Sequence, residues 1–226
     1  MIAVNVRSEI PKIKVMSTLS RRFFCITISA ISIFLNPLFA KDKDRGIKKE
    51  VTRWTVQKTS TLHIQGATNV NNFGCDITGY YQPDTLICFD DNPANKTVPL
   101  KGALEIDVAK FDCHNTMLTN DLRKTLKAKD HPKLVIRFLS FERNPVMRNC
   151  KDVLKGAVQV ELAGSSKVFD IFYTFEKTDS AFIKLNGNQC FTFSDFNLTP
   201  PRKLAGLVKV KDKFVVDFNL LLQPVN

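Results

Sequence analysis

The chain has 226 residues and a net charge of +11, with 33 Lys and Arg against 22 Asp and Glu. Its basic residues are scattered along the sequence rather than gathered into a block, so the charge indicates a solubilising surface and disfavours a nucleic-acid site. After the first 40 residues, the rest of the chain fits one domain with one core, which at this size buries roughly 70% of its unfolded surface.

The first 40 residues have the pattern of a secretory signal peptide. An apolar run of 13 residues, Phe23–Leu35, follows Arg21 and Arg22, and the small residue Ala40 precedes the expected cleavage site. The run is shorter than the roughly 20 apolar residues of a membrane-spanning helix. A permanent anchor, a twin-arginine export route and a start at Met16 remain open alternatives. We expect an exported protein, periplasmic or secreted.

Cleavage after residue 40 would remove five basic residues and one acidic residue, which leaves a net charge of +7. A charged segment, 41–50, then precedes one domain, 51–226. From Arg53 onward, short alternating stretches between turn residues are typical of an antiparallel all-β domain. The expected strands are 51–58, 61–68, 73–81, 98–109, 133–142, 154–163, 167–176, 181–186, 189–193, 206–211 and 213–223.

Two connections in this part of the chain have distinct patterns. Segment 84–99 is polar, carries no strand pattern past Phe89 and is expected to form an exposed loop. Lys211-Asp212 is expected to turn the chain between the last two strands, which gives a terminal hairpin. About ten strands and one helix fit either a barrel or a sandwich, and periodicity leaves the choice open.

One helix is expected between Phe111 and Phe138. Leu118, Leu122 and Leu126 recur at four-residue spacing, Thr119 can cap the helix, and Pro132 stops it. The pattern predicts a helix of roughly ten residues.

Five cysteines remain after the expected cleavage, so at most two internal disulfides can form and one thiol is left over. Their spacing contains no C-x-x-C element, which disfavours a zinc site or a redox-active dithiol. In an oxidising compartment we expect one or two structural bridges, with the pairing open. The candidates are Cys75, Cys88, Cys113, Cys150 and Cys190.

No catalytic motif is present in the sequence. The three histidines, His63, His114 and His131, belong to no recognisable pattern, and His63 is expected at the surface. Cys113 and His114 are adjacent, so on a strand their side chains would point to opposite faces and could not act as nucleophile and base. We expect neither a metal nor a cofactor, and a binding protein rather than an enzyme.

The order of elements resembles the YceI-like polyisoprenoid-binding family. The similar features are a strand, a polar helix, Pro132 and an apolar strand that ends in Arg137-Phe138, followed by the paired strands of Leu154–Phe175 and the closing segment Phe191–Leu222. The resemblance covers about residues 53–223. It implies an exported, lipocalin-like, eight-stranded antiparallel barrel with one short helix in a crossover connection, whose interior holds one long-chain apolar lipid.

The lipid that the resemblance implies is a polyisoprenoid or a fatty-acid derivative. Five mature cysteines are more than the family usually carries, which suggests a cysteine-bearing subgroup. A filled structural barrel that binds an envelope protein or an acidic polymer through its basic surface is the alternative. Peripheral contact with a membrane or envelope component is left open, as is the oligomeric state. The expected ligand-binding residues are the inward-facing positions Phe73, Ile77, Leu104, Ile106, Val108, Leu122, Leu126, Leu134, Ile136, Phe138, Val158, Val160, Phe169, Ile171 and Tyr173.

Overall fold

The computed structural model describes residues 50–77, 84–90, 97–146, 151–178, 181–203 and 207–225. The expected signal peptide and nearly all of the charged segment lie outside these residues, as does Cys150. The described strands are β1 (Glu50–Val56), β2 (Thr61–Thr68), β3 (Asn72–Ile77), β4 (Thr85–Asp90), β5 (Val98–Lys101), β6 (Ala103–Asp107), β7 (Phe111–Asp112), β8 (Lys133–Phe141), β9 (Asp152–Leu162), β10 (Ser165–Lys177), β11 (Ile183–Thr192), β12 (Arg202–Lys203) and β13 (Val208–Val225).

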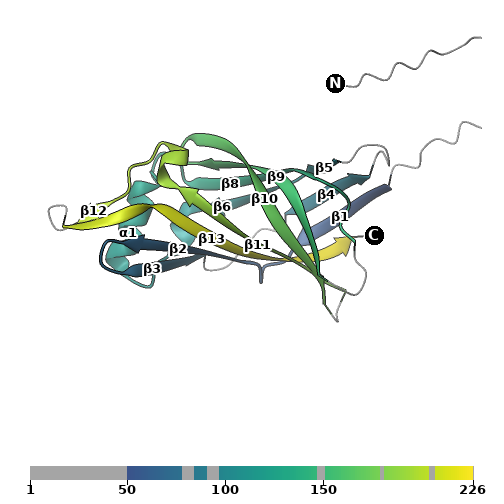
Figure 1. Cartoon of the computed structure of the whole chain (residues 1–226), viewed down its shortest axis with the longest axis horizontal. Helices are drawn as coiled ribbons and strands as arrows, with labels where there is room; N and C mark the ends of the chain where they lie inside the picture. Colours follow the sequence, from purple (N-terminus) through teal and green to yellow (C-terminus); the bar gives the residue numbers. More distant parts are fainter. Residues whose placement is uncertain are drawn as a thin grey trace, which may run out of the picture. The chain divides into compact units, whose positions relative to one another are not determined.

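The strands form a closed eight-stranded antiparallel barrel (Figure 1). The pairings run β1–β4–β5–β8–β9–β10–β11–β13, and β13 closes the circuit by pairing with β1. The described residues add one α-helix, α1 (Thr116–Thr125), and two 3-10 turns, η1 (Val108–Lys110) and η2 (Phe193–Phe196). A barrel, rather than a sandwich, is therefore the correct architecture.

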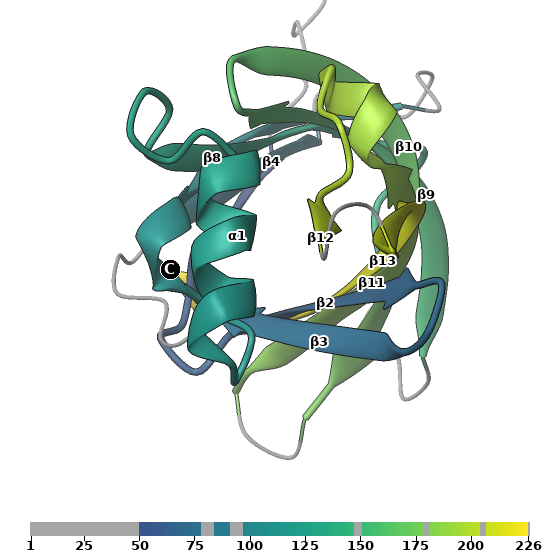
Figure 2. The same cartoon turned by 90° about the vertical axis from the view of Figure 1, so that its left-hand side faces the viewer.

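The two ends of the barrel are built differently. At one end β1, β4 and β5 complete the wall. At the other end the pairings run β6–β8–β9–β10–β11–β13–β2–β3–β7, and α1 follows β7 directly. Figure 2 looks onto this second end, where α1 lies across the barrel between β8 and β3. The helix is thus a crossover connection at one end, as the resemblance implies.

The start of α1 corrects the expected cap. Asn115, not Thr119, caps the helix, because its side chain accepts a hydrogen bond from the backbone N–H of Leu118 at 3.0 Å. Thr119 lies inside the helix and is buried. Its hydroxyl oxygen accepts a hydrogen bond from the backbone N–H of Cys113 at 2.9 Å, so it ties α1 to the residue that follows β7.

The expected terminal hairpin at Lys211-Asp212 is wrong, because β13 runs through this position as one strand of 18 residues. Asp212 is bound to η2, where its carboxylate accepts hydrogen bonds from the backbone N–H of Ser194 at 3.1 Å and from the Ser194 hydroxyl at 2.7 Å. A register shift against β2 between Val210 and Phe214 absorbs the local irregularity. Likewise the expected strands 181–186 and 189–193 form the single strand β11.

Segment 84–99 is not a loop throughout, because Thr85–Asp90 forms β4 and pairs with β1 and β5. The expected strand 98–109 is instead two strands, β5 and β6. They break at Gly102, which has a φ of 155° and where a Cβ atom would lie 2.6 Å from the Thr85 carbonyl oxygen. β4 was missed because its apolar run, 86–89, is only four residues long and stands between polar stretches.

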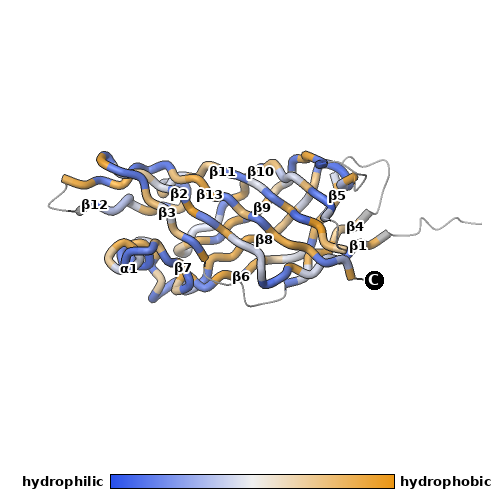
Figure 3. Tube along the Cα trace, turned by 90° about the horizontal axis from the view of Figure 1, so that it is seen from below, coloured by the Kyte–Doolittle hydropathy of each residue, from blue (hydrophilic) through white to orange (hydrophobic). Residues whose placement is uncertain are grey.

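The β1 end of the barrel is filled by side chains. Alternate residues of each strand point inward, and Figure 3 shows the resulting exchange of apolar and polar positions along the strands. The rings of Phe141 and Phe175 meet edge to face, with centroids 5.4 Å apart. Around them lie side chains that are at most 3% exposed: Trp54, Val56, Leu86, Leu154, Leu185 and Leu222.

Candidate ligand-binding cavity

An apolar cavity occupies the part of the barrel beside α1. Its volume is about 110 Å³, counting only the space that the centre of a water molecule can reach. One water needs roughly 10–15 Å³ by this measure, so the cavity is too large to be a packing defect. Its wall comes from α1, η2 and strands that include β2, β3, β6, β8, β9, β10, β11 and β13, and from no described residue of β1, β4 or β5. The barrel is therefore filled at one end and hollow at the other.

The cavity wall contains most of the residues that strand alternation and helix spacing select. Thirteen of the fifteen expected ligand-binding residues lie in it. That they contact a ligand stays a prediction. They are Phe73, Ile77, Leu104, Ile106, Leu122, Leu126, Leu134, Ile136, Phe138, Val158, Val160, Ile171 and Tyr173.

The other two expected residues are not in the described wall. Val108 lies on η1 rather than on a strand, where the 3-10 turn buries its side chain completely in the core. Phe169 is half-buried and packs its ring against Phe191 and Phe196, at centroid distances of 4.8 and 5.8 Å. Phe191 and Phe196 line the cavity, so Phe169 supports the wall from behind them.

Several wall residues come from segments that were not selected as site residues. On β13 the alternation of Phe214, Val216, Phe218 and Leu220 is clear in the sequence and could have identified them. No alternation marks the residues of η2, because a 3-10 turn has a different period. The unselected apolar residues of the wall are Leu62, Ile64, Cys75, Phe111, Leu162, Phe191, Phe193, Phe196, Phe214, Val216, Phe218 and Leu220.

Two glycines shape the aromatic part of the wall. Gly66 is paired across the strands with Phe73, and Gly187 is paired with Phe218. A Cβ atom at these glycines would lie 2.2 Å from Cζ of Phe73 and 2.0 Å from Cζ of Phe218. Each ring therefore lies flat over a glycine, against the barrel wall, instead of standing across the cavity.

Tyr173 separates the cavity from the filled end. Its side chain is 1% exposed, and its ring meets Phe218 of the cavity wall and Phe141 of the filled end. Among the described residues no hydrogen-bond partner reaches its hydroxyl. Burial raises the pKa of Tyr173 well above its usual value, so the phenol stays neutral. No Asp, Glu, Lys, Arg or His lies in the described part of the wall.

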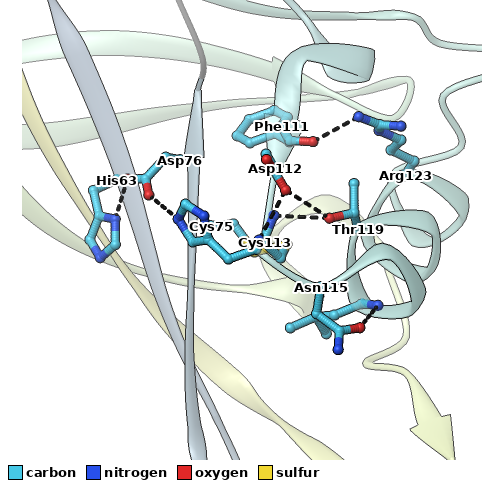
Figure 4. Close-up of a disulfide and its surroundings, with 11 residues drawn as sticks. His63, Cys75, Asp76, Phe111, Asp112, Cys113, Asn115, Thr119 and Arg123 are labelled. Carbon is cyan, nitrogen blue, oxygen red and sulfur yellow. Dashed lines mark hydrogen bonds and ion pairs between the residues drawn. A yellow bond between two sulfur atoms is a disulfide. The ribbon is translucent and has the colours of Figure 1, made fainter.

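A disulfide joins Cys75 on β3 to Cys113, which lies between β7 and α1 (Figure 4). The expectation of a structural bridge is confirmed for this pair. Cys75 also lies in the cavity wall, so the bridge attaches the helical connection to the wall itself. Cys190 is exposed and free, so it is not a bridge residue in the structure. Cys88 is buried on β4.

The YceI-like domain model matches residues 48–222 of this chain. The chain belongs to the YceI-like family. Two solved structures have the same fold as this YceI-like barrel. One is BcnA of Burkholderia cenocepacia, with 16% identity, 72% of this chain and 95% of that chain covered, and a TM-score of 0.52.

The other is a polyisoprenoid-binding domain from Saccharophagus degradans that is implicated in plant cell wall breakdown. It has 13% identity, 75% of this chain and 97% of that chain covered, and a TM-score of 0.56. At these identities the similarity establishes the fold alone. Among curated proteins, none matches this chain.

Beside the disulfide of the YceI-like barrel, two histidines converge on one carboxylate. His63 Nδ1 lies 2.5 Å from Asp76 Oδ1, and His114 Nε2 lies 2.7 Å from Asp76 Oδ2. His63 lies partly exposed at the surface, as expected, and no motif in the sequence predicts that it meets Asp76 together with His114. Burial opposes ionisation of Asp76, but the hydrogen bonds from His114 and His63 outweigh it and lower the pKa of the carboxyl. The bond to Asp76 raises the pKa of His114.

The described part of the chain shows neither a group of three potential metal-ligating residues nor a helix that is long and apolar enough to cross a membrane. His63, His114 and Asp76 form a hydrogen-bonded cluster. It links β2, β3 and the segment before α1. His63 is 13 residues from Asp76 along the chain, and His114 is 38 residues from it.

We expect this cluster to respond to pH. The raised pKa of His114 contributes stability below about pH 6.5 that fades as pH rises through the folded-state value, and the lowered pKa of Asp76 contributes above about pH 4. The link should be strongest between these limits. Asp76→Asn should return the pKa of His114 towards its ordinary value, as measured by an NMR titration of the imidazole protons. An unchanged His114 titration in this variant would contradict the assignment.

Proposed function

We propose that the protein is exported and binds a long-chain apolar lipid, a polyisoprenoid or a fatty-acid derivative, in the cavity without catalysing a reaction. The observation that carries the proposal is the cavity itself, a hollow lined almost wholly by aliphatic and phenylalanine side chains, with no charged group among its described residues. Polar head groups would lose their hydration there without compensating hydrogen bonds, whereas a hydrocarbon chain would gain free energy because its apolar surface leaves water.

Burial of apolar area is enough to retain such a ligand. Each buried methylene contributes about 0.8 kcal/mol, so a chain that buries ten of them gains about 8 kcal/mol before the costs of ordering. An apolar cavity of this kind also stays dry, which removes the cost of displacing ordered water. Retention therefore needs no ionic anchor, in agreement with the composition of the wall.

The remaining parts of the proposal rest on separate observations. The polyisoprenoid-binding description of the Saccharophagus degradans domain supports the ligand class. The apolar run at residues 23–35 supports export, as does the Cys75–Cys113 disulfide, because such bonds persist in oxidising compartments. A non-catalytic role agrees with a wall in which the titratable groups of the described residues are a neutral tyrosine and a disulfide-bonded cysteine.

Extraction of the purified protein tests the proposal directly. The protein is isolated from the compartment where it accumulates, extracted with organic solvent and analysed by mass spectrometry, and the stripped protein is then mixed with a polyprenyl alcohol. We expect a co-purified long-chain lipid and uptake of about one chain per barrel. No extracted lipid together with no uptake would reject the proposal in favour of a barrel that binds no lipid.

A further inference from the structure

Three separate segments expose large apolar side chains. Leu207, Met117 and Val70 are 74%, 69% and 68% exposed, which are the highest values among the large hydrophobic residues in the described segments. Leu207 immediately precedes β13, Met117 is in the first turn of α1, and Val70 is in the β2–β3 turn. These three residues are called the rim.

The rim lies at the end of the barrel that contains the cavity. Its segments belong to or adjoin α1, β2, β3 and β13, all of which contribute to the cavity wall. Figures 1 and 2 both show these elements gathered at the end where α1 and β12 lie. None of the rim side chains is needed for the core, because each is more than two-thirds exposed.

Two of the rim segments are held in fixed positions. The side-chain amide of Asn69 donates to the Leu207 carbonyl at 2.9 Å, and the backbone N–H of Asn69 donates to the Lys209 carbonyl at 3.0 Å. The turn is closed by the backbone N–H of Thr68, which donates to the Asn71 carbonyl at 2.7 Å. The turn that carries Val70 is therefore attached to the backbone of Leu207 and Lys209.

Basic residues accompany the rim. Lys209 and Lys211 are exposed just after Leu207. On α1 and the turn that follows it, Lys124 and Lys127 are exposed as well. Lys124 lies seven residues after Met117 and so shares its helix face. Exposed apolar residues mixed with lysines are the composition of a surface that inserts shallowly into a bilayer with anionic head groups.

We propose that the rim docks the barrel on a lipid bilayer that carries anionic head groups, with the cavity end towards the membrane. A bilayer fits better than a protein, because the apolar side chains are separate points among positive charges rather than one continuous patch. The proposal goes beyond lipid binding but draws on it in one respect, since a bilayer is the source of a long apolar chain that water cannot dissolve.

Vesicle binding of charge-substituted variants tests the rim. The purified protein is sedimented with vesicles of phosphatidylethanolamine and phosphatidylglycerol and, for comparison, with phosphatidylcholine vesicles. We expect Val70→Asp combined with Leu207→Asp to lower the fraction bound to anionic vesicles by about tenfold or more, and Met117→Asp to lower it by a smaller factor. The matched control is Phe172→Asp, because Phe172 is 63% exposed but lies on the outer wall of β10.

The outcomes separate docking from its alternatives. Equal loss in the Phe172 control, or full binding by the double variant, would overturn the proposal, as would equal binding to both kinds of vesicle. Thermal unfolding shows that the variants are folded, and uptake of polyprenyl alcohol from detergent solution should be unchanged in them. If the unmodified barrel takes up no polyprenyl alcohol, the proposal of lipid binding is wrong. The vesicle-binding results still test membrane docking by the rim.

Discussion

Replacing Ile136 with tryptophan is expected to abolish uptake of a polyprenyl chain. Ile136 is half-buried on β8 and lies in the cavity wall, between its strand partners Leu104 and Val160. A larger side chain at this position must project into the hollow, because the wall around it is already packed. We expect the affinity for the chain to fall by more than about tenfold, equivalent to at least 1.4 kcal/mol of binding free energy.

Titration of the stripped protein with a fluorescent polyprenyl analogue measures this loss. The matched control is Val168→Trp, because Val168 is 55% exposed on the outside of β10 and a tryptophan there does not reach the cavity. Overpacking can cost about 1–3 kcal/mol, so both variants are compared by urea unfolding first. A folded Ile136→Trp protein that binds the analogue as tightly as the control would place the ligand elsewhere.

Removal of the Cys75–Cys113 disulfide should give the largest loss of stability. The bond links residues 38 apart in sequence. A cross-link of that span restricts the unfolded chain and so stabilises the folded state by about 2–4 kcal/mol. Replacing both cysteines with alanine should lower the free energy of unfolding by this amount. The same change frees the segment before α1 from the cavity wall, so the protein should also take up a polyprenyl chain less well.

Urea unfolding monitored by far-UV circular dichroism measures the change. Cys190→Ala is the matched control, because this cysteine is exposed and free, and we expect its unfolding midpoint to stay within experimental error of the unmodified protein. A double alanine variant as stable as the control would show that the bridge does not stabilise the native barrel. Retained stability with reduced uptake would instead assign the bridge to the shape of the cavity.

Strand alternation predicted the inward faces well because side chains in a sheet repeat every two residues. Leu104, Ile106, Leu134 and Val160, which were expected to face inward, lie in the cavity wall. The same rule failed at Val108, where the chain leaves the strand for a 3-10 turn. The helix was predicted from its leucines, but its start was missed because Asn115 and Thr119 are both capable caps.

Contacts between distant residues could not be predicted from local patterns. The cysteine count limited the number of bridges but left their pairing open, and the approach of Cys75 to Cys113 depends on β3 and β7 being neighbours. The pairing of β2 with β3 sets His63 opposite Asp76, and the β3–β7 neighbourhood brings His114 to the same carboxylate. Asp76 and His114 are 38 residues apart in the sequence, and no motif connects them.

The sequence by itself determined the all-β class, the position of the helix and most of the faces that turn inward, because these follow from the spacing of apolar residues along one chain. Only the tertiary structure decided that the barrel is filled around Phe141 and Phe175 and hollow beside α1. Whether inward side chains meet across a barrel depends on its closure and on details such as Phe218 lying flat over Gly187. Such contacts join residues from several strands, so no local pattern contains them.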